Sequence, residues 1–278
     1  MKNSRISILP ILVLMALSSA LKANAQEGIN PYRVSTRSTL HGVSLINNLD
    51  TYLSGYNYTG AGYTLQHETM RLAHTGSYQW TFQTVTEAIA GYAKLQSNTQ
   101  LTFMASRYWS GYHTFDIDKR LKLLAGAQIE LSGGALYLPT NSNNPVSAKL
   151  RTSIGASAML IYSAPKKYTV RYRIDIPLAG LMFSPQYAQS YYEIFGLGDT
   201  RGTIKFTHPE NSPSWRHTLT SDISIGANTL RLAYIANLYQ SRVNNLRTHQ
   251  YSHTFAVGFC RTIYKVKNND PIKAFAPY

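Results

Sequence analysis

Apolar and polar residues alternate with a period of two along much of this sequence. The pattern is most regular at 168–176, YTVRYRIDI, where one parity is aromatic or aliphatic and the other carries Arg171, Arg173 and Asp175. Successive side chains of a β-strand point to opposite faces, so this segment has one apolar face and one densely ionic face. Such a strand is typical of a transmembrane β-barrel, which has lipid outside and a polar interior.

Ten segments are predicted as strands, and most reach the ~9–11 residues that a tilted strand needs to cross a bilayer. No sequence repeat of 20–50 residues is visible. The sequence therefore predicts an all-β fold, a single antiparallel transmembrane β-barrel of about ten strands, with eight or twelve as the alternatives. The predicted strands are 37–47, 60–73, 78–92, 100–113, 120–132, 147–163, 167–183, 214–225, 228–240 and 250–265.

The connections between these strands are predicted to alternate in length. Short periplasmic turns and longer external loops are typical of outer-membrane barrels. The segment 203–207 also alternates, but an eleventh strand there would break the pattern, so we assign it to an external loop. The predicted turns are 74–77, 114–119, 164–166 and 226–227, and the predicted loops are 48–59, 93–99, 133–146, 184–213 and 241–249.

The first 25 residues have the pattern of a cleavable export signal: two basic residues, an apolar core at 6–17 and Ala-Asn-Ala at 23–25. We expect a signal peptide at 1–25, an outer-membrane barrel at 26–265 and a C-terminal tail at 266–278. Removing the signal with its three cations would lower the net charge from +14 to +11. The exported chain has no basic run, so we expect membrane lipid and no nucleic acid as a partner. The single cysteine, Cys260, allows no intrachain disulfide.

Eleven charged residues are assigned to the inner face by parity, seven of them cations and four carboxylates. One interpretation is a network of ion pairs that fills a narrow bore, because buried charges must be paired. The other is a cationic constriction that selects anions. We favour the filled bore, and expect the three excess cations to lie near a mouth. The eleven residues are Glu87, Lys122, Glu130, Lys149, Arg151, Arg171, Arg173, Asp175, Arg216, Asp222 and Arg231.

The two faces of the predicted strand 100–113 cannot be assigned clearly. If Leu101 and Phe103 face lipid, Arg107 has the same parity and also faces lipid. An arginine near mid-depth would cost a few kcal/mol. We expect a bulge or an interfacial position to relieve this cost.

Candidate catalytic and metal-binding residues are few. His113, Asp116 and Asp118 cluster at a predicted turn, which we interpret as an interfacial turn. His249 and His253 are spaced for zinc on a helix, but on a strand they would lie ~13 Å apart. The motifs of serine hydrolases, P-loop proteins and zinc peptidases are absent from the sequence. Neither a Ser–His set like that of outer-membrane phospholipases nor an omptin-like set of acidic residues and histidine can be assembled. We therefore expect no catalytic residue, cofactor or metal.

The connection at 184–213 is too long for a plain loop and has its own apolar residues. We expect it to cap the barrel, to fold into the bore or to contact a partner. Its candidate contact residues are Tyr187, Tyr191, Tyr192 and Phe195.

Several segments together resemble one family of exported proteins from Bacteroides-type Gram-negative bacteria, a domain family of unknown function. They are LDTYLSGYNYTG at 49–60, RLKLLAGAQIELSGG at 120–134, NSNNP at 141–145, IDIPLAGLMFSPQYAQSYYEIFGLGD at 174–199 and YSHTFAVGF at 251–259. The resemblance implies an outer-membrane barrel and brings no activity, ligand or site residue.

Three functions are carried forward from the sequence. We favour a structural or interaction barrel with a filled lumen, whose external loops face a protein partner or a surface polysaccharide. The alternative is a narrow, anion-preferring channel or transporter for small solutes, and an outer-membrane enzyme is the outlier. The sequence contains no indication of oligomeric state.

Overall fold

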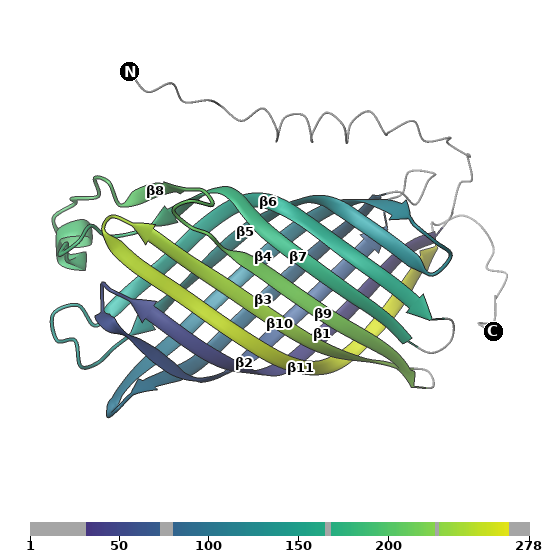
Figure 1. The fold of residues 1–278 in the computed structure, drawn as a ribbon, viewed down its shortest axis with the longest axis horizontal. Helices are drawn as coiled ribbons and strands as arrows, with labels where there is room; N and C mark the ends of the chain where they lie inside the picture. The colour runs from purple at the N-terminus through teal and green to yellow at the C-terminus, as the bar shows by residue number, and fades with distance from the viewer. Residues whose placement is uncertain (1–31, 73–79, 165–167, 226–227, 267–278) are drawn as a thin grey trace, which may run out of the picture.

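Ten long antiparallel strands form a closed barrel (Figure 1). The computed structural model describes residues 32–72, 80–164, 168–225 and 228–266. Each strand pairs with its neighbour in the chain, and β1 pairs with β11 to close the wall. The predicted fold class is confirmed. The strands are β1 (Tyr32–Asp50), β2 (Ser54–Leu72), β3 (Trp80–Leu95), β4 (Asn98–Asp116), β5 (Leu121–Tyr137), β6 (Val146–Ala164), β7 (Tyr168–Phe183), β9 (Trp215–Ile225), β10 (Asn228–Val243) and β11 (Leu246–Val266), with a short β8 (Ile204–Thr207).

The segment predicted as loop at 203–207 contains β8, which pairs with the end of β7 through Ile204 and Phe183. β9 pairs only with the first half of β7, up to Asp175. β8 therefore completes the wall where β9 is absent, and it adds no eleventh crossing. Between β8 and β9, the carbonyl of Asn211 accepts a hydrogen bond from the backbone of β10 at Arg242.

The stagger of the strands fixes the width of the barrel. Following hydrogen-bonded partners once around the wall from Thr152 of β6 leads back to β6 at Ala164, a shift of 12 residues. With a rise of ~3.3 Å per residue and ~4.8 Å between strands, this shift tilts the strands by about 40°. Eight strands already leave a bore that side chains just fill, so ten leave only a little more space.

The strands are longer than predicted, which shortens four of the five predicted loops, three of them to tight connections. The loops predicted at 48–59, 93–99 and 241–249 are tight connections at 51–53, 96–97 and 244–245. Gln96, Asn244 and Asn245 adopt positive φ, as tight hairpin turns require. Only 138–145 and 184–214 are long. We call the end of the barrel that carries these five connections the loop end, and the opposite end the turn end.

Side chains alternate between the two faces of the wall as predicted. In β7, Arg171, Arg173 and Asp175 are buried, whereas Tyr168 and Tyr172 are exposed on the outside. The outside is aliphatic and aromatic over most strands, as lipid contact requires. The predicted signal peptide at 1–25, the tail beyond 266, the turns at 74–77 and 226–227, and residues 165–166 of the turn predicted at 164–166 lie outside the described residues. Within the described ranges, no helix is long and apolar enough to cross a membrane.

Arg107 departs from this pattern, and the expected bulge is not its explanation. The registers of β4 with β3 and with β5 run through Arg107 without a break. Arg107 is also the middle residue of β4, far from either interface. Its side chain is exposed on the outer face, donates a hydrogen bond to Thr86 Oγ1 at 3.1 Å and lies over the Trp109 ring at 5.4 Å. These local contacts offset part of the cost of the charge.

We predict that Arg107→Leu stabilises the barrel. An arginine at mid-depth on the lipid face costs ~2–4 kcal/mol, which the contacts with Thr86 and Trp109 only partly offset. The net gain in free energy of unfolding should be about 1–2 kcal/mol. Denaturant unfolding in lipid vesicles, followed by tryptophan fluorescence, measures it, with Leu131→Ile on the neighbouring strand as the control. A destabilised Arg107→Leu variant would show that this position does not face lipid.

Candidate functional site

The bore is filled by twelve charged side chains, which we call the bore ion-pair network. The cations lie on β6, β7, β9 and β10, and most carboxylates come from β1, β2, β3 and β5. Four of the nine pairs therefore cross the interior of the barrel: Lys149 with Asp50, Arg171 and Arg231 with Glu68, and Arg216 with Glu87. The network consists of Lys149, Arg151, Arg171, Arg173, Arg216 and Arg231 with Asp50, Glu68, Glu87, Glu130, Asp175 and Asp222.

Glu68 is the centre of the part of the bore ion-pair network that lies nearest the turn end. Its Oε1 accepts from Arg171 at 3.1 Å and from Arg231 at 3.0 Å. Arg231 has no exposed surface. It also forms a bidentate ion pair with Asp222, in which Nε donates to Oδ1 at 2.6 Å and Nη2 donates to Oδ2 at 2.8 Å. Arg171 lies 3.7 Å from the same carboxylate. Two cations thus share two carboxylates, which leaves no net charge in this layer.

The middle of the bore is held by Arg173 and Arg216. Arg173 Nε donates to Asp175 at 2.8 Å, and its Nη1 donates to Gln83 of β3 at 2.7 Å. Arg216 Nη2 donates to Glu87 of β3 at 2.8 Å. These bonds connect β7 and β9 with β3 on the other side of the barrel, so the two arginines close the bore here.

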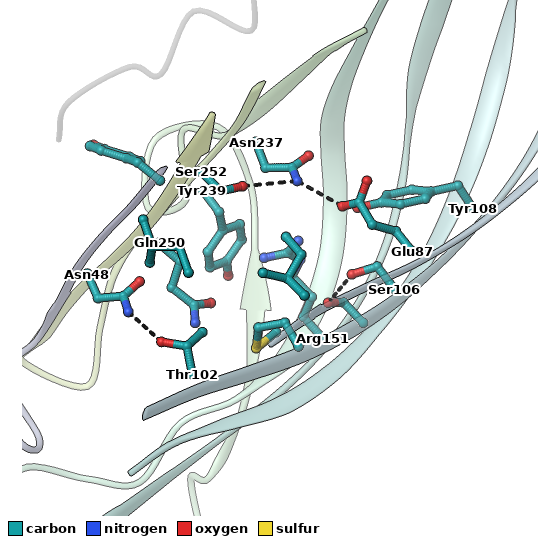
Figure 2. A pocket seen from close by; sticks show the side chains of 15 residues that line it. Asn48, Glu87, Thr102, Ser106, Tyr108, Arg151, Asn237, Tyr239, Gln250 and Ser252 are labelled. Carbon is teal, nitrogen blue, oxygen red and sulfur yellow. Dashed lines mark hydrogen bonds between the residues drawn. The ribbon is translucent and has the colours of Figure 1, made fainter. Parts of the chain in front are cut away.

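Nearer the loop end, Arg151 pairs with Glu130, and its guanidinium lies 3.5 Å from the centre of the Tyr239 ring. Lys149 Nζ contacts Asp50 at 2.7 Å. Beside Arg151 lies a cavity of about 50 Å³, which is lined by polar side chains such as Asn48 and by apolar ones such as Ile89 (Figure 2). A cavity of this size holds only a few water molecules. It is therefore too small for a solute.

The eleven residues that the sequence placed on the inner face differ from this network in three respects. Lys122 has the inward parity but lies at the turn end of β5, where its side chain is 52% exposed and contacts Asp116 at 3.1 Å. Its assignment to the lumen is wrong, because parity specifies a face and not a depth. Asp50 and Glu68 were missed. The network has six cations and six carboxylates, so the expected excess of three cations does not exist in it.

Asp50 and Glu68 were missed for different reasons. Asp50 fell in a segment predicted as loop, which is the end of β1. Glu68 lies on β2, whose outer face carries polar His67, so the two faces could not be told apart. The available signal was the exact alternation of Thr64, Gln66 and Glu68, all of which are buried.

The connection 184–214 closes the loop end of the bore. Tyr52, in the turn after β1, reaches across to this connection, where its hydroxyl donates to the Gln189 carbonyl at 3.0 Å and its ring packs edge-on against Tyr191. Burial raises the pKa of both tyrosines, so the Tyr52 hydroxyl remains a donor at neutral pH. Beside it, the Asn141 amide donates to the Leu53 carbonyl at 3.0 Å.

Apolar side chains close both ends of the network. At the loop end Leu53, Tyr58 and Leu136 are buried in one cluster. At the turn end Tyr112, Leu124 and Met159 form another. The charged side chains of the network are mostly buried, with side-chain exposed fractions from 0% for Arg231 to 18% for Arg151. The long connection lies across the mouth, and none of its predicted contact residues pairs with the bore ion-pair network.

The histidines that suggested metal binding have separate partners. His253 pairs with the Tyr234 hydroxyl at 2.7 Å and His249 with Asn47 at 2.6 Å. His113 packs against Trp80 and Phe115, away from Asp118. Within the described parts of the chain, no three His, Cys, Asp or Glu side chains converge as a metal site.

A protein-family model described as "Protein of unknown function (DUF3316)" matches residues 9–270. The chain belongs to this family. Membership agrees with the resemblance seen in the sequence to a family of unknown function, while the expected Bacteroides-type source stays a prediction. No curated protein matches the sequence.

Solved structures with a similar barrel include the outer-membrane protease OmpT from Escherichia coli, with 7% identity, a TM-score of 0.49, and 85% of this chain and 98% of that chain covered. Neisserial surface protein A has 13% identity and a TM-score of 0.34, with 84% and 98% covered. Ail of Yersinia pestis has 7% identity and a TM-score of 0.33, with 82% and 99% covered. At these values the DUF3316 chain inherits no activity, substrate or ligand from them.

We predict that Glu68→Gln destabilises this DUF3316 barrel strongly. The substitution leaves Arg171 and Arg231 with Asp222 as their shared carboxylate, and breaking a buried ion pair from one side costs ~3–5 kcal/mol. Asp116→Asn, which breaks the exposed pair with Lys122, is the control and should cost less than ~1 kcal/mol. Denaturant unfolding in vesicles measures both. Equal stability of the two variants would mean that the bore charges are solvated in the folded protein.

Proposed function

We propose that this protein is a non-conducting, non-enzymatic barrel of the outer membrane that acts through its outer surfaces. One observation carries the proposal: Arg171 and Arg216 reach carboxylates on the opposite wall, so that ion pairs of the bore network lie across the bore. Transport through this bore would require several buried pairs to separate at once. Each separation would leave uncompensated buried charges, which is costly.

The outer-membrane location is supported by the architecture itself. A closed antiparallel barrel with an apolar outside and a polar inside is the form in which β-strands cross a membrane, because closure leaves no unpaired strand edge in lipid. We infer that the loop end faces the cell exterior. Exposed side chains there, including Tyr56 and Tyr187, are available to a protein partner or a surface polysaccharide.

The absence of enzymatic activity is also part of the proposal. Its support is that the described polar side chains of the bore, which are arginines, carboxylates, amides and hydroxyls, are mostly buried and bonded to one another. The two serine hydroxyls of the bore that meet a carboxylate, Ser153 beside Glu130 and Ser157 beside Asp175, are buried, and each carboxylate is also held by an arginine. A substrate would have to displace these contacts to reach them.

Planar-bilayer recording on the purified full-length protein tests the filled bore. We expect no stable conductance steps at neutral pH, because the ion pairs and the two apolar clusters exclude a water-filled path. A porin of known conductance, inserted under the same conditions, serves as the control for insertion. Large, stable, anion-selective steps would overturn the proposal and favour the channel interpretation.

Cysteine labelling on whole cells tests the orientation. In a Cys260→Ser background, Asn143→Cys in the connection 138–145 should react with a membrane-impermeant maleimide, and Lys119→Cys in the turn 117–120 should not. Both residues are exposed at their own end of the barrel, so the membrane alone distinguishes them. Preferential labelling of Lys119→Cys would invert the topology.

A further inference from the structure

A compact set of apolar side chains is exposed beside the mouth of the barrel, where η1 (Tyr192–Gly196) and β8 lie together at the loop end (Figure 1). Their exposed fractions run from 59% to 70%. A contiguous apolar patch of this kind usually marks a contact surface. We call the set the loop-end shelf; it consists of Tyr192, Phe195, Leu197, Ile204 and Phe206.

The shelf continues the outer face of the barrel wall. Ile204 and Phe206 are paired in register with Phe183 and Leu181 of β7. The pairing of β7 with β6 shifts by one residue at Ile154 and Gly155, and beyond this bulge the odd-numbered residues of β7 point outward. Phe195 of η1 stacks on Phe183, with 6.2 Å between the ring centres. Phe183 therefore joins the two halves of the shelf, and the apolar outside of β7 extends into it without a polar break.

The shelf is held in place before anything binds to it. The Tyr191 hydroxyl accepts the backbone N–H of Ala148 at 2.6 Å, which ties η1 to the edge of β6. Glu193 accepts from the Ser190 N–H at 2.7 Å, and the Asn244 amide donates to the Ser184 carbonyl at 2.8 Å. A surface fixed in this way loses little conformational entropy on contact.

The chemistry of the shelf fits lipid better than a charged ligand. Its five residues are aromatic or aliphatic, and aromatic side chains are enriched where a barrel meets the membrane–water interface. The nearby charges cancel, because Arg201 pairs with Asp199 at 3.3 Å and Lys205 of β8 is offset by Glu193 of η1. The shelf thus offers apolar contact and no basic patch for a phosphate or an acidic polymer.

We propose that the loop-end shelf inserts into the boundary between headgroups and acyl chains of the outer leaflet, so that η1 and β8 form an interfacial anchor beside the mouth. The anchor holds the connection 184–214 over the bore from the lipid side, while Tyr52 holds it from the opposite wall. This goes beyond the filled bore, because it concerns the outside of the barrel and does not depend on whether the bore conducts.

Site-specific fluorescence on the full chain tests the anchor. A single cysteine is placed by Phe195→Cys in the Cys260→Ser background, labelled with an environment-sensitive dye, and the protein is refolded into phosphatidylcholine vesicles with and without brominated acyl chains. Asn143→Cys, in the other long connection, is the matched control for water, and Ile154→Cys on the outer wall is the control for lipid. Leu197→Cys is the second shelf position and replaces Phe195→Cys where that variant does not fold.

We expect the shelf label to show blue-shifted emission and quenching by brominated lipid, close to the label at Ile154 and unlike the label at Asn143. High salt should leave both signals unchanged, because the contact is apolar. Emission and quenching equal to those at Asn143, or loss of the signal in high salt, would overturn the lipid anchor and leave the shelf to a water-borne partner. A conducting bore with a quenched shelf would refute the proposed function and leave this inference standing.

Discussion

The need to pair every charge inside a narrow, water-poor bore is the constraint on which this structure depends. A barrel of ten strands with a shift of 12 residues has a narrow bore, and an arginine side chain is long enough to reach across it. A buried charge without a partner is costly, whereas a paired and hydrogen-bonded one is tolerated. Glu68, between Arg171 of β7 and Arg231 of β10, shows how the fold meets this constraint: one carboxylate pairs with cations of two strands at once.

The same network gives the barrel its cohesion across the bore. Hydrogen bonds of the wall connect only neighbouring strands, but Arg216 joins β9 to β3 and Arg173 joins β7 to β3. The apolar clusters at the mouths then exclude water, which strengthens the interactions between them. The side chains that fill the bore are thus the same ones that hold opposite walls together. Opening a passage would break these contacts.

If the bore is closed, the surfaces available for function are the outer wall and the loop end. The wall is apolar apart from positions such as Arg107, whose contacts with Thr86 and Trp109 lie within the same face. The loop end has two distinct features, unlike the uniform wall. It combines a mouth closed by Tyr52 and Tyr191 with the apolar loop-end shelf beside it, so one connection, 184–214, links the interior, the rim and the membrane surface.

The sequence alone determined the fold class and most of the inner face, because a period of two is a local property of a strand that a closed barrel preserves. It placed Arg171, Arg173 and Asp175 on one side of β7, where they are buried. It also contained the Asn244–Asn245 pair, a hairpin signature that we read as part of a longer loop. The strand ends were misplaced there because strands in this barrel continue beyond the length that a bilayer requires.

Only the tertiary structure decided how deep each charged side chain lies in the bore, whether the charges balance and which residues pair. Lys122 and Glu130 share one parity on β5, yet Lys122 is exposed at a mouth and Glu130 is buried against Arg151. Which carboxylate meets which arginine follows from the tilt and stagger of strands far apart in the chain, and no local pattern encodes these. Glu68 and Asp50 became the missing countercharges because closure of the wall brought β1 across the bore from β6, and β2 across from β7 and within reach of β10.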